Sequence, residues 1–294
     1  RGKKRKIAAF LAYVGKGYQG FQRNPGARTI EDELERAIVA AGGISADNAG
    51  DFTKVQWTRA ARTDKGVSAV GQCIALRMVL DPPGVLERIN AALPEGFKIF
   101  GYKRVTGGFN AKTMCDRRRY EYVIPTCAFD PRRCLPRRED DKEAKAFVFD
   151  EELRARVNKI LGNYCGTHNF HNYTVRVDPN DAAAMRYIIS FECGEPFVID
   201  GVEFVRTTVV GQSFMLHQIR KLIGTMLCVV RGYLAEEDQI FALKTKESCS
   251  HEPLALDEYA DDVEAFKKSH IYPHMASTEK EEGTMEAWVR MLPL

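Results

Sequence analysis

The order of predicted strands and helices in the first third of the chain recurs in its middle third, and this repetition constrains the fold more than any other feature. In the first copy, the pattern predicts a buried strand at residues 7–14 and an amphipathic helix that begins at the capping residue Thr29. Two strands, a second helix at 86–93 and a strand at 98–105 follow. The order β-α-β-β-α-β is typical of the ferredoxin-like arrangement.

In the second copy, a strand is predicted at residues 119–124, and a helix begins after the capping residue Asp150. An alternating strand at 186–193 precedes a hairpin at 197–210, whose Asp-Gly turn suits a tight antiparallel connection. Apolar residues with a 3.6-residue period then predict a long helix over 215–230. The chain is therefore predicted to be α+β, with two ferredoxin-like units.

The second copy has no predicted closing strand, because nothing from residue 234 to the end of the chain has a convincing strand pattern. Residues 130–145 are charged, contain proline and show no periodicity, which predicts a surface loop. Short amphipathic stretches after residue 259 predict a helical C-terminal extension. The predicted domains are residues 1–110, residues 111–250 and the extension at 251–294.

A single carboxylate, Asp64, lies between two cations on the turn that joins the predicted strands 55–58 and 72–78. Arg62 precedes it by two residues and Lys65 follows directly. Opposite charges nearby lower the pKa of a carboxylate, so Asp64 is expected to stay ionised and is a candidate nucleophile or general base. The alternative is an aspartate that only begins a turn, beside two solvated cations.

Residues 61–69, Ala-Arg-Thr-Asp-Lys-Gly-Val-Ser-Ala, resemble the catalytic loop of the TruA family of tRNA pseudouridine synthases, and in particular its eukaryotic branch. In that family the aspartate is the essential catalytic residue. The resemblance implies that Asp64 isomerises specific uridines in tRNA to pseudouridine, with no metal and no organic cofactor. It also implies that the two units form a central sheet with a basic RNA-binding cleft between them. The sequence leaves open whether Asp64 attacks the ribose C1′ or removes a ribose proton.

Two further motifs carry the resemblance. Tyr120 is the first tyrosine of a Tyr-X-Tyr strand that follows basic residues, and in the family this tyrosine stacks in the active site. Arg220 ends the segment Phe-Met-Leu-His-Gln-Ile-Arg and corresponds to the arginine that pairs with the catalytic aspartate. An aromatic face suits an unstacked base, and a guanidinium can hold a carboxylate in one rotamer. The alternatives are a core tyrosine and a solvated helical arginine.

Local basic clusters must carry any RNA binding, because the net charge of the 294-residue chain is only +3. The arginines at 117–119 lie next to Tyr120, and further pairs stand at 132–133 and 137–138, for which solvated charge is the alternative. The predicted substrate-binding residues are Tyr120, Arg62, Lys65, Gln22, Arg117, Arg118, Arg119 and His217.

The resemblance further implies partners and a location. The expected partner is tRNA, with mRNA or small nuclear RNA as additional substrates, and the expected state is a monomer or a homodimer. No apolar run is long enough to span a membrane, and the eight cysteines show no zinc spacing. The expected location is the nucleus, with a mitochondrial form as an alternative.

Other functional classes fit less well. Residues 15–20 match G-x-G-x-x-G by letter, but a dinucleotide fingerprint opens a helix directly, whereas residues 21–26 intervene here. The same stretch resembles the family segment in which Tyr13, Tyr18 and Gln22 have counterparts.

A metal site and a non-catalytic role are two further alternatives. His168 and His171 are three residues apart with no acidic third ligand nearby, so this segment is interpreted as a loop that orders the cleft or contacts RNA. A non-catalytic RNA-binding or tRNA-folding protein of the same fold would not need Asp64, Tyr120 and Arg220, yet all three are present.

The family closes its second unit with an apolar, glycine-containing strand that supplies a leucine to the active site. No such segment occurs between about residues 246 and 251. Either the architecture departs from the family or residues are missing from the chain. We favour missing residues, because the loss of a sheet strand exposes backbone pairing groups.

Overall fold

The computed structural model describes residues 2–81, 83–131 and 147–246, which form two compact units that meet in sequence at Asp116 and Arg117. The surface loop predicted at 130–145, the region around residue 250 and the C-terminal extension lie wholly or largely outside the described residues. Every strand pairing in the described parts is antiparallel. The predicted mixture of helices and antiparallel sheets is confirmed.

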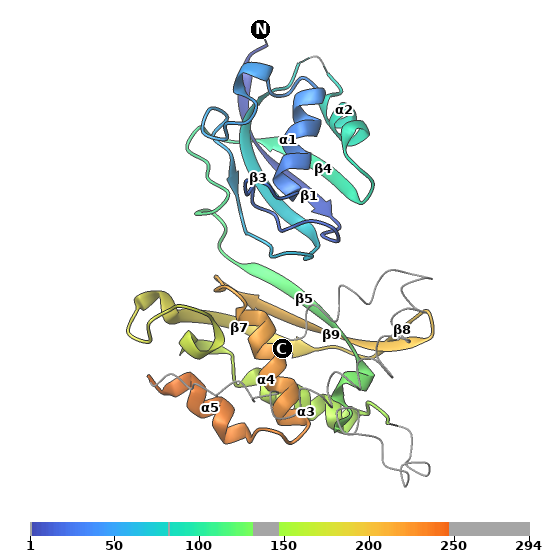
Figure 1. Cartoon of the computed structure of the whole chain (residues 1–294), viewed down its shortest axis with the longest axis vertical. Helices are drawn as coiled ribbons and strands as arrows, with labels where there is room; N and C mark the ends of the chain where they lie inside the picture. Colours follow the sequence, from blue (N-terminus) through green and yellow to red (C-terminus); the bar gives the residue numbers. More distant parts are fainter. Residues whose placement is uncertain (1, 82, 132–146, 247–294) are drawn as a thin grey trace. The chain divides into compact units, whose positions relative to one another are not determined.

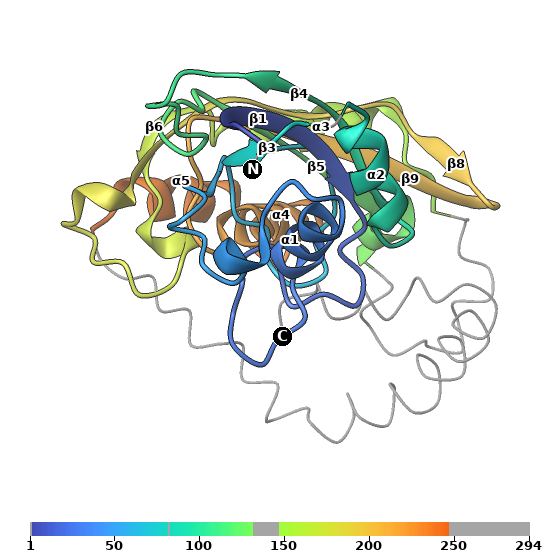
Figure 2. The same cartoon turned by 90° about the horizontal axis from the view of Figure 1, so that it is seen from above.

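The first unit is a four-stranded sheet with two helices packed on one face (Figures 1 and 2). The strand order is β2-β3-β1-β4. Its elements are β1 (Lys4–Tyr13), α1 (Ile30–Ala40), β2 (Thr58–Arg59), β3 (Ala69–Val79), α2 (Val85–Ala92) and β4 (Phe97–Arg104). The core lies between the sheet and the helices, and Leu11, Leu34 and Ile74 are fully buried in it.

The second unit also has its helices and its core on one side of a sheet (Figure 1). The strand order is β5-β9-β7-β6, with β8 paired to β9 alone. Its elements are β5 (Arg118–Pro125), α3 (Glu151–Gly162), β6 (Gly166–Asn169), β7 (Met185–Cys193), β8 (Phe197–Ile199), β9 (Val202–Gly211), α4 (Gln218–Val230) and α5 (Glu236–Lys244). No described helix combines the length and the apolar character needed to cross a membrane.

The predicted helix starts and the hairpin turn are confirmed. The Thr29 side chain accepts a hydrogen bond from the Asp32 amide, and the Asp150 carboxylate accepts one from the Leu153 amide. Asp200 and Gly201 both have positive φ, 48° and 79°, as a two-residue turn between right-twisted strands requires.

Three predicted elements differ from the structure. The strand predicted at 55–58 begins only at Thr58, because residues 52–56 form a turn in which the Trp57 amide bonds back to the Phe52 carbonyl and Gln56 has a φ of 50°. The long helix begins at Gln218 and not at residue 215, since His217 is left-handed. The segment interpreted as a loop around His168 contains strand β6, paired with β7, and a short 3-10 turn.

Candidate active site

Asp64 lies on a tight turn between β2 and β3. The Val67 amide donates to the Asp64 carbonyl at 3.2 Å, and Gly66 has a φ of 75°. Asp64 itself is half-buried, whereas its neighbours Arg62 and Lys65 are exposed. The turn predicted from the Asp-Lys-Gly sequence is therefore present, with the carboxylate flanked by two solvent-facing cations.

The segment at residues 15–21 braces this turn through its backbone. The Phe21 amide donates to the Thr63 carbonyl at 3.0 Å, and the Gly66 amide donates to the Tyr18 carbonyl at 3.2 Å. The two bonds hold the chain on both sides of Asp64. Because both partners are backbone groups, the turn has little freedom to shift relative to the bracing segment.

Two glycines in the bracing segment allow this close approach. A Cβ on Gly15 would lie 2.2 Å from the Val67 carbonyl oxygen, and one on Gly20 would lie 3.0 Å from the Thr63 carbonyl oxygen. Gly20 also has a φ of 112°, which side chains rarely tolerate. The glycines of the G-x-G-x-x-G pattern thus allow two backbone segments to approach closely, and the next helix begins only at Ile30, whereas a nucleotide fingerprint opens a helix directly.

An aromatic cluster lies beneath the braced turn. Tyr13 contacts Phe21 and Phe97, with ring centroids 5.5 and 6.2 Å apart, and Tyr18 meets Phe97 edge-on at 5.4 Å. The Tyr13 hydroxyl also hydrogen-bonds the Thr63 hydroxyl at 2.8 Å in a buried position. This contact fixes the residue before Asp64 through its side chain as well as its backbone.

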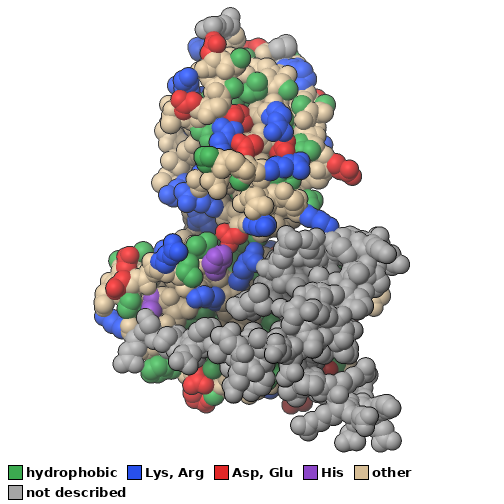
Figure 3. Space-filling view, in the orientation of Figure 1, with side chains coloured by type: hydrophobic (Ala, Val, Ile, Leu, Met, Phe, Trp, Pro, Cys, Tyr) green, Lys and Arg blue, Asp and Glu red, His purple; other side chains and the backbone are tan. Residues whose placement is uncertain are grey.

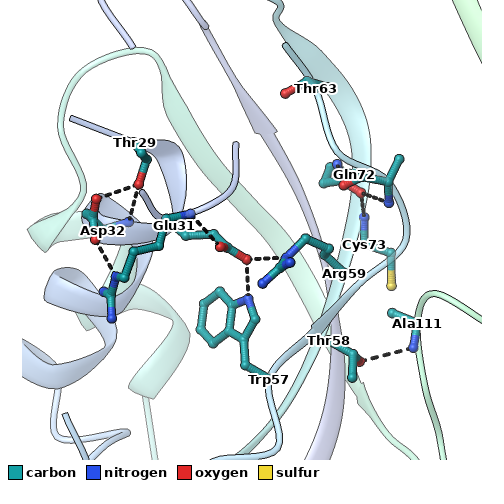
Figure 4. A network of polar contacts seen from close by, with 12 residues as sticks. Thr29, Glu31, Asp32, Trp57, Thr58, Arg59, Thr63, Gln72, Cys73 and Ala111 are labelled. Atoms are coloured by element: carbon teal, nitrogen blue, oxygen red, sulfur yellow. Dashed lines mark hydrogen bonds and ion pairs between the residues drawn. The ribbon is translucent and has the colours of Figure 1, made fainter. Parts of the chain in front are cut away.

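A buried carboxylate, Glu31 on α1, joins three separate segments of the first unit (Figure 4). Its Oε1 accepts from the Trp57 indole at 2.7 Å and from the Arg59 guanidinium at 2.5 Å. Its Oε2 accepts from the Arg23 backbone amide at 2.9 Å. Glu31 therefore links the segment that carries Gln22 to the strand that leads into the Asp64 turn.

Burial raises the pKa of Glu31, and the opposing effect of Arg59 and the donated hydrogen bonds is smaller. The Arg23 side chain adds ion pairs with Asp32 and Glu35. It also stacks 4.2 Å above the Phe52 ring. The buried glutamates of α1 were not expected from the sequence, where only the apolar face of this helix was identified.

In the second unit, Tyr120 lies on β5 and packs edge-on against Phe214, with ring centroids 5.3 Å apart. Phe214 fits there because position 211 is a glycine, where a Cβ would lie 2.8 Å from the phenylalanine ring. Tyr120 is half-buried, so its side chain is neither fully enclosed in the core nor fully exposed to solvent. Phe214 was noted in the sequence only as part of a motif, and its contact with Tyr120 was missed.

Arg220 lies half-buried in the first turn of α4, close to Tyr122. Burial raises the pKa of the Tyr122 hydroxyl, and the nearby positive charge of Arg220 opposes this with a smaller lowering effect. Strand alternation places Tyr122 on the same face of β5 as Tyr120. The structure therefore brings two of the predicted site residues, Tyr120 and Arg220, to one face of the second unit.

The start of α4 is anchored by the segment at 172–174. The Lys221 ammonium donates to the Thr174 carbonyl at 2.7 Å, and the Thr174 hydroxyl donates to the Leu216 carbonyl at 3.0 Å. Burial lowers the pKa of Lys221. His217 is exposed and has a φ of 59° at the helix start, so the chain bends at His217, between Phe214 and the helix that carries Arg220.

The three consecutive arginines do not form one surface. Arg118 is on the Tyr120 face of β5 and donates to the Gln212 carbonyl at 2.5 Å. Arg119 points to the opposite face, where it pairs with Glu121 at 2.9 Å. Arg117 is exposed just before the strand begins. The Tyr120 face of β5 therefore carries Arg118, whereas Arg119 lies on the other face.

Charges of both signs are interspersed on the visible surface of the first unit (Figure 3). This distribution agrees with the small net charge and favours local phosphate contacts over a uniformly positive surface. Gln22, like Arg62 and Lys65, is exposed. Within the described residues, no three His, Cys, Asp or Glu side chains gather as a metal site would require.

The histidine segment has a structural role within the second unit. His168 bonds the Cys165 carbonyl at 2.8 Å, and buried His171 contacts the Asn169 side chain at 3.0 Å. Phe170 between them is fully buried. The two histidines therefore hold the backbone and side chains of their own segment in place.

Comparison with known proteins identifies the family. A family model described as tRNA pseudouridine synthase matches residues 160–266. The Pseudouridylate synthase 1 homolog of Mus musculus is 40% identical, over 99% of this chain and 74% of its own length. The Homo sapiens protein of the same name is also 40% identical, over 98% and 73%. The tRNA pseudouridine synthase 1 of Yarrowia lipolytica is 30% identical, over 97% and 73%.

The alignment with the mouse protein spans 321 positions, more than the 294 residues of this chain. The relative therefore carries residues inside the aligned region that have no counterpart here. A solved structure of an unknown protein from Galdieria sulphuraria aligns over 79% of this chain and 94% of its own, at 13% identity and a TM-score of 0.20, too low to bear on the fold. Identity of 30–40% over nearly the full chain shows that this chain belongs to the family of tRNA pseudouridine synthases, the enzymes that isomerise uridine in tRNA to pseudouridine.

Proposed function

We propose that Asp64 is the catalytic carboxylate with which this chain isomerises uridine. The observation that carries the proposal is the braced turn: backbone bonds from Phe21 and Tyr18 hold the chain on both sides of a half-buried aspartate. A catalytic group must be held within a fraction of an ångström of its productive position. A turn that only reverses the chain would not need two glycines to approach its backbone.

The reaction breaks the N1–C1′ bond of the uridine and forms a C5–C1′ bond, while the proton at C5 is lost and N1 gains one. The target base must leave the helical stack to reach the carboxylate. Asp64 acts either as the nucleophile at C1′ or as the base that removes a ribose proton. Both routes require an ionised carboxylate in a fixed position, which is why the brace matters to each.

Tyr120 is proposed as the platform for the extruded base. A half-buried ring whose edge is fixed by Phe214 keeps a defined orientation, and base–aromatic stacking contributes about 1–3 kcal/mol per base. Arg220 is proposed to pair with the Asp64 carboxylate, because a guanidinium can bind both carboxylate oxygens. Its support is the family motif together with its half-buried place on α4.

RNA contacts are proposed for the exposed polar residues around these groups. Arg62, Lys65 and Gln22 are exposed at the braced turn and the segment beside it. In the second unit the proposed contacts come from exposed Arg117 and His217 and from half-buried Arg118. We propose Arg119 only for a contact on the opposite sheet face, because it pairs with Glu121 there.

For the fold, we propose that both units are variants of one ferredoxin-like plan. The first has the expected strand order, with the last strand beside the first. The second follows it with β5, β7 and β9, adds β6 at one edge, and has no described strand on the outer edge of β5. A closing strand would pair there, so a further segment beside β5 stays a prediction. The central sheet, the helical extension, nuclear location, mRNA or small nuclear RNA substrates and a monomer or homodimer stay predictions.

The test is Asp64→Asn, which keeps the shape of the side chain and removes its charge. We expect turnover, measured as tritium release from C5-labelled uridine in tRNA, to be abolished, while tRNA affinity changes by no more than a few-fold because phosphate contacts dominate binding. Asp51→Asn is the matched control, because Asp51 also begins a turn in the first unit, where it accepts from the Thr53 amide. Turnover near the wild-type rate in Asp64→Asn would refute the assignment.

A further inference from the structure

We propose that Gln72 is a positioning residue for the catalytic loop. Its side chain makes the hydrogen bonds to Ala61 that a backbone partner would make if the pairing of β2 with β3 continued. The proposal rests on the assignment of Asp64 as the catalytic carboxylate. Gln72 lies on β3, directly across from the point where the chain leaves β2 and enters the loop (Figure 4).

The backbone ladder between β2 and β3 ends just before this point. It pairs Thr58 with Ala75 and Arg59 with Ile74, and the Ala60 amide makes a last bond to the Cys73 carbonyl at 2.9 Å. Beyond it, the chain separates from β3 and runs to Asp64.

At Ala61 the Gln72 side chain takes over the pairing. Its Nε2 donates to the Ala61 carbonyl at 3.0 Å, and its Oε1 accepts from the Ala61 amide at 3.3 Å. An amide side chain carries the same donor and acceptor as a peptide group. Gln72 therefore extends the ladder by one residue while leaving the chain free to diverge afterwards.

Gln72 occupies a position where an apolar residue would be expected. On β3 it lies on the same face as Ile74, Leu76 and Met78, which all point into the core, and only 5% of its surface is exposed. A buried polar side chain is tolerated only where its hydrogen bonds are made. Its Nε2 bond goes to Ala61, and its Oε1 also accepts from the Cys73 amide at 3.1 Å, so the polar group at this core position serves the entrance of the loop.

The part of the loop that precedes Asp64 is thereby held at two points, Ala61 and Thr63. Gln72 fixes Ala61, and Phe21 and Tyr13 fix Thr63. Only exposed Arg62 lies between these two anchors. Loss of the first anchor would let the chain pivot about the second and displace the Asp64 carboxylate.

The test compares Gln72→Met with a matched control, Asn90→Leu. Asn90 on α2 makes the same pair of bonds, donating to the Ile99 carbonyl at 2.9 Å and accepting from the Ile99 amide at 2.8 Å, away from the loop. Each variant replaces a side-chain amide by an apolar group of similar shape. Gln72→Met removes the two bonds to Ala61 and the one from the Cys73 amide, and Asn90→Leu removes the two bonds to Ile99. We expect similar losses of Tm, but a fall in kcat of about 10- to 100-fold for Gln72→Met alone, with tRNA affinity within a few-fold of wild type.

A second variant, Gln72→Glu, gives a readout that a purely structural residue would not. A protonated carboxyl can replace both amide bonds, whereas an ionised one repels the Ala61 carbonyl. Relative to wild type, the kcat of Gln72→Glu should rise as the pH falls from 8 to 6, at a temperature where both proteins are folded. This variant decides the question if Gln72→Met does not fold.

Equal kcat values in Gln72→Met and Asn90→Leu, or a pH-independent ratio for Gln72→Glu, would overturn the inference. These outcomes are distinct from a failure of the proposed function, which Asp64→Asn reports by itself. An inactive Asp64→Asn beside a fully active Gln72→Met would retain the catalytic carboxylate and reject the positioning role.

Discussion

Gly15→Ala is the most direct perturbation of the braced turn. The new Cβ would lie 2.2 Å from the Val67 carbonyl oxygen and 2.5 Å from its carbon. Because ordinary contacts begin near 3.4 Å, the Val67 peptide must retreat by roughly 1 Å. The amide of the same residue closes the turn by bonding the Asp64 carbonyl, so the displacement reaches Asp64, the proposed catalytic residue.

The expected loss of stability follows from this overlap. Forced insertion of a methyl group into a packed site costs about 1–3 kcal/mol, and the lower entropy of the unfolded alanine chain offsets about 0.4–1 kcal/mol of it. The net loss of roughly 1–2 kcal/mol corresponds to a Tm lower by roughly 2–8 °C. The rate should suffer more than the stability, since a displacement of about 1 Å can cost about 100-fold.

Single-turnover tritium release at saturating tRNA measures the rate, and thermal unfolding measures the Tm. Gly71→Ala is the control, because a Cβ there meets nothing within 4 Å and its backbone has no positive φ. We expect Gly71→Ala to keep the wild-type rate and to change stability by about 0.5 kcal/mol or less. Wild-type rate and Tm in Gly15→Ala, or equal defects in both variants, would refute the brace.

Three further predictions concern single side chains. Because burial raises the pKa of Glu31 above its ordinary 4.5, its protonation stabilises the folded state at low pH, and this stabilisation is lost as the pH rises through the raised pKa. The free energy of unfolding in urea should therefore fall less between pH 4 and 7 for Glu31→Gln than for the wild type. Tyr120→Phe should lower the rate more than tRNA affinity, and Tyr120→Ala should lower both, whereas wild-type turnover in Tyr120→Ala would make this tyrosine a core residue only. Arg118→Glu should weaken tRNA binding and flatten its dependence on salt more than Arg119→Glu does, and equal losses would contradict the separation of the two arginines by the strand.

Features that depend on neighbours in sequence could be predicted. Thr29 and Asp150 were identified as helix caps, and the turn at Asp200 as a hairpin, because each depends on residues within three positions. Asp64 was placed on a turn for the same reason. Its candidacy for catalysis came from the whole nonapeptide and not from the turn alone.

Features that depend on distant partners could not be predicted. The burial of Glu31 was not predicted, because only the apolar face of its helix was identified and its partners Trp57 and Arg59 lie more than 25 positions away. Gln72 was not singled out in the predicted strand 72–78, because the Ala61 backbone that satisfies its side chain becomes visible only in three dimensions. The division of the arginines at 117–119 was within reach of the sequence, since residues of a strand alternate between faces.

The brace described around Asp64 draws only on residues of the first unit, from Tyr13 to Gln72. A nucleophile or base whose position is set by its own half of the protein need not be rebuilt each time a substrate binds, which saves reorganisation during the reaction. The same arrangement separates two evolutionary demands. Substitutions in the second unit that retain Arg220 should leave the backbone that carries Asp64 undisturbed, so the two halves can diverge at different rates.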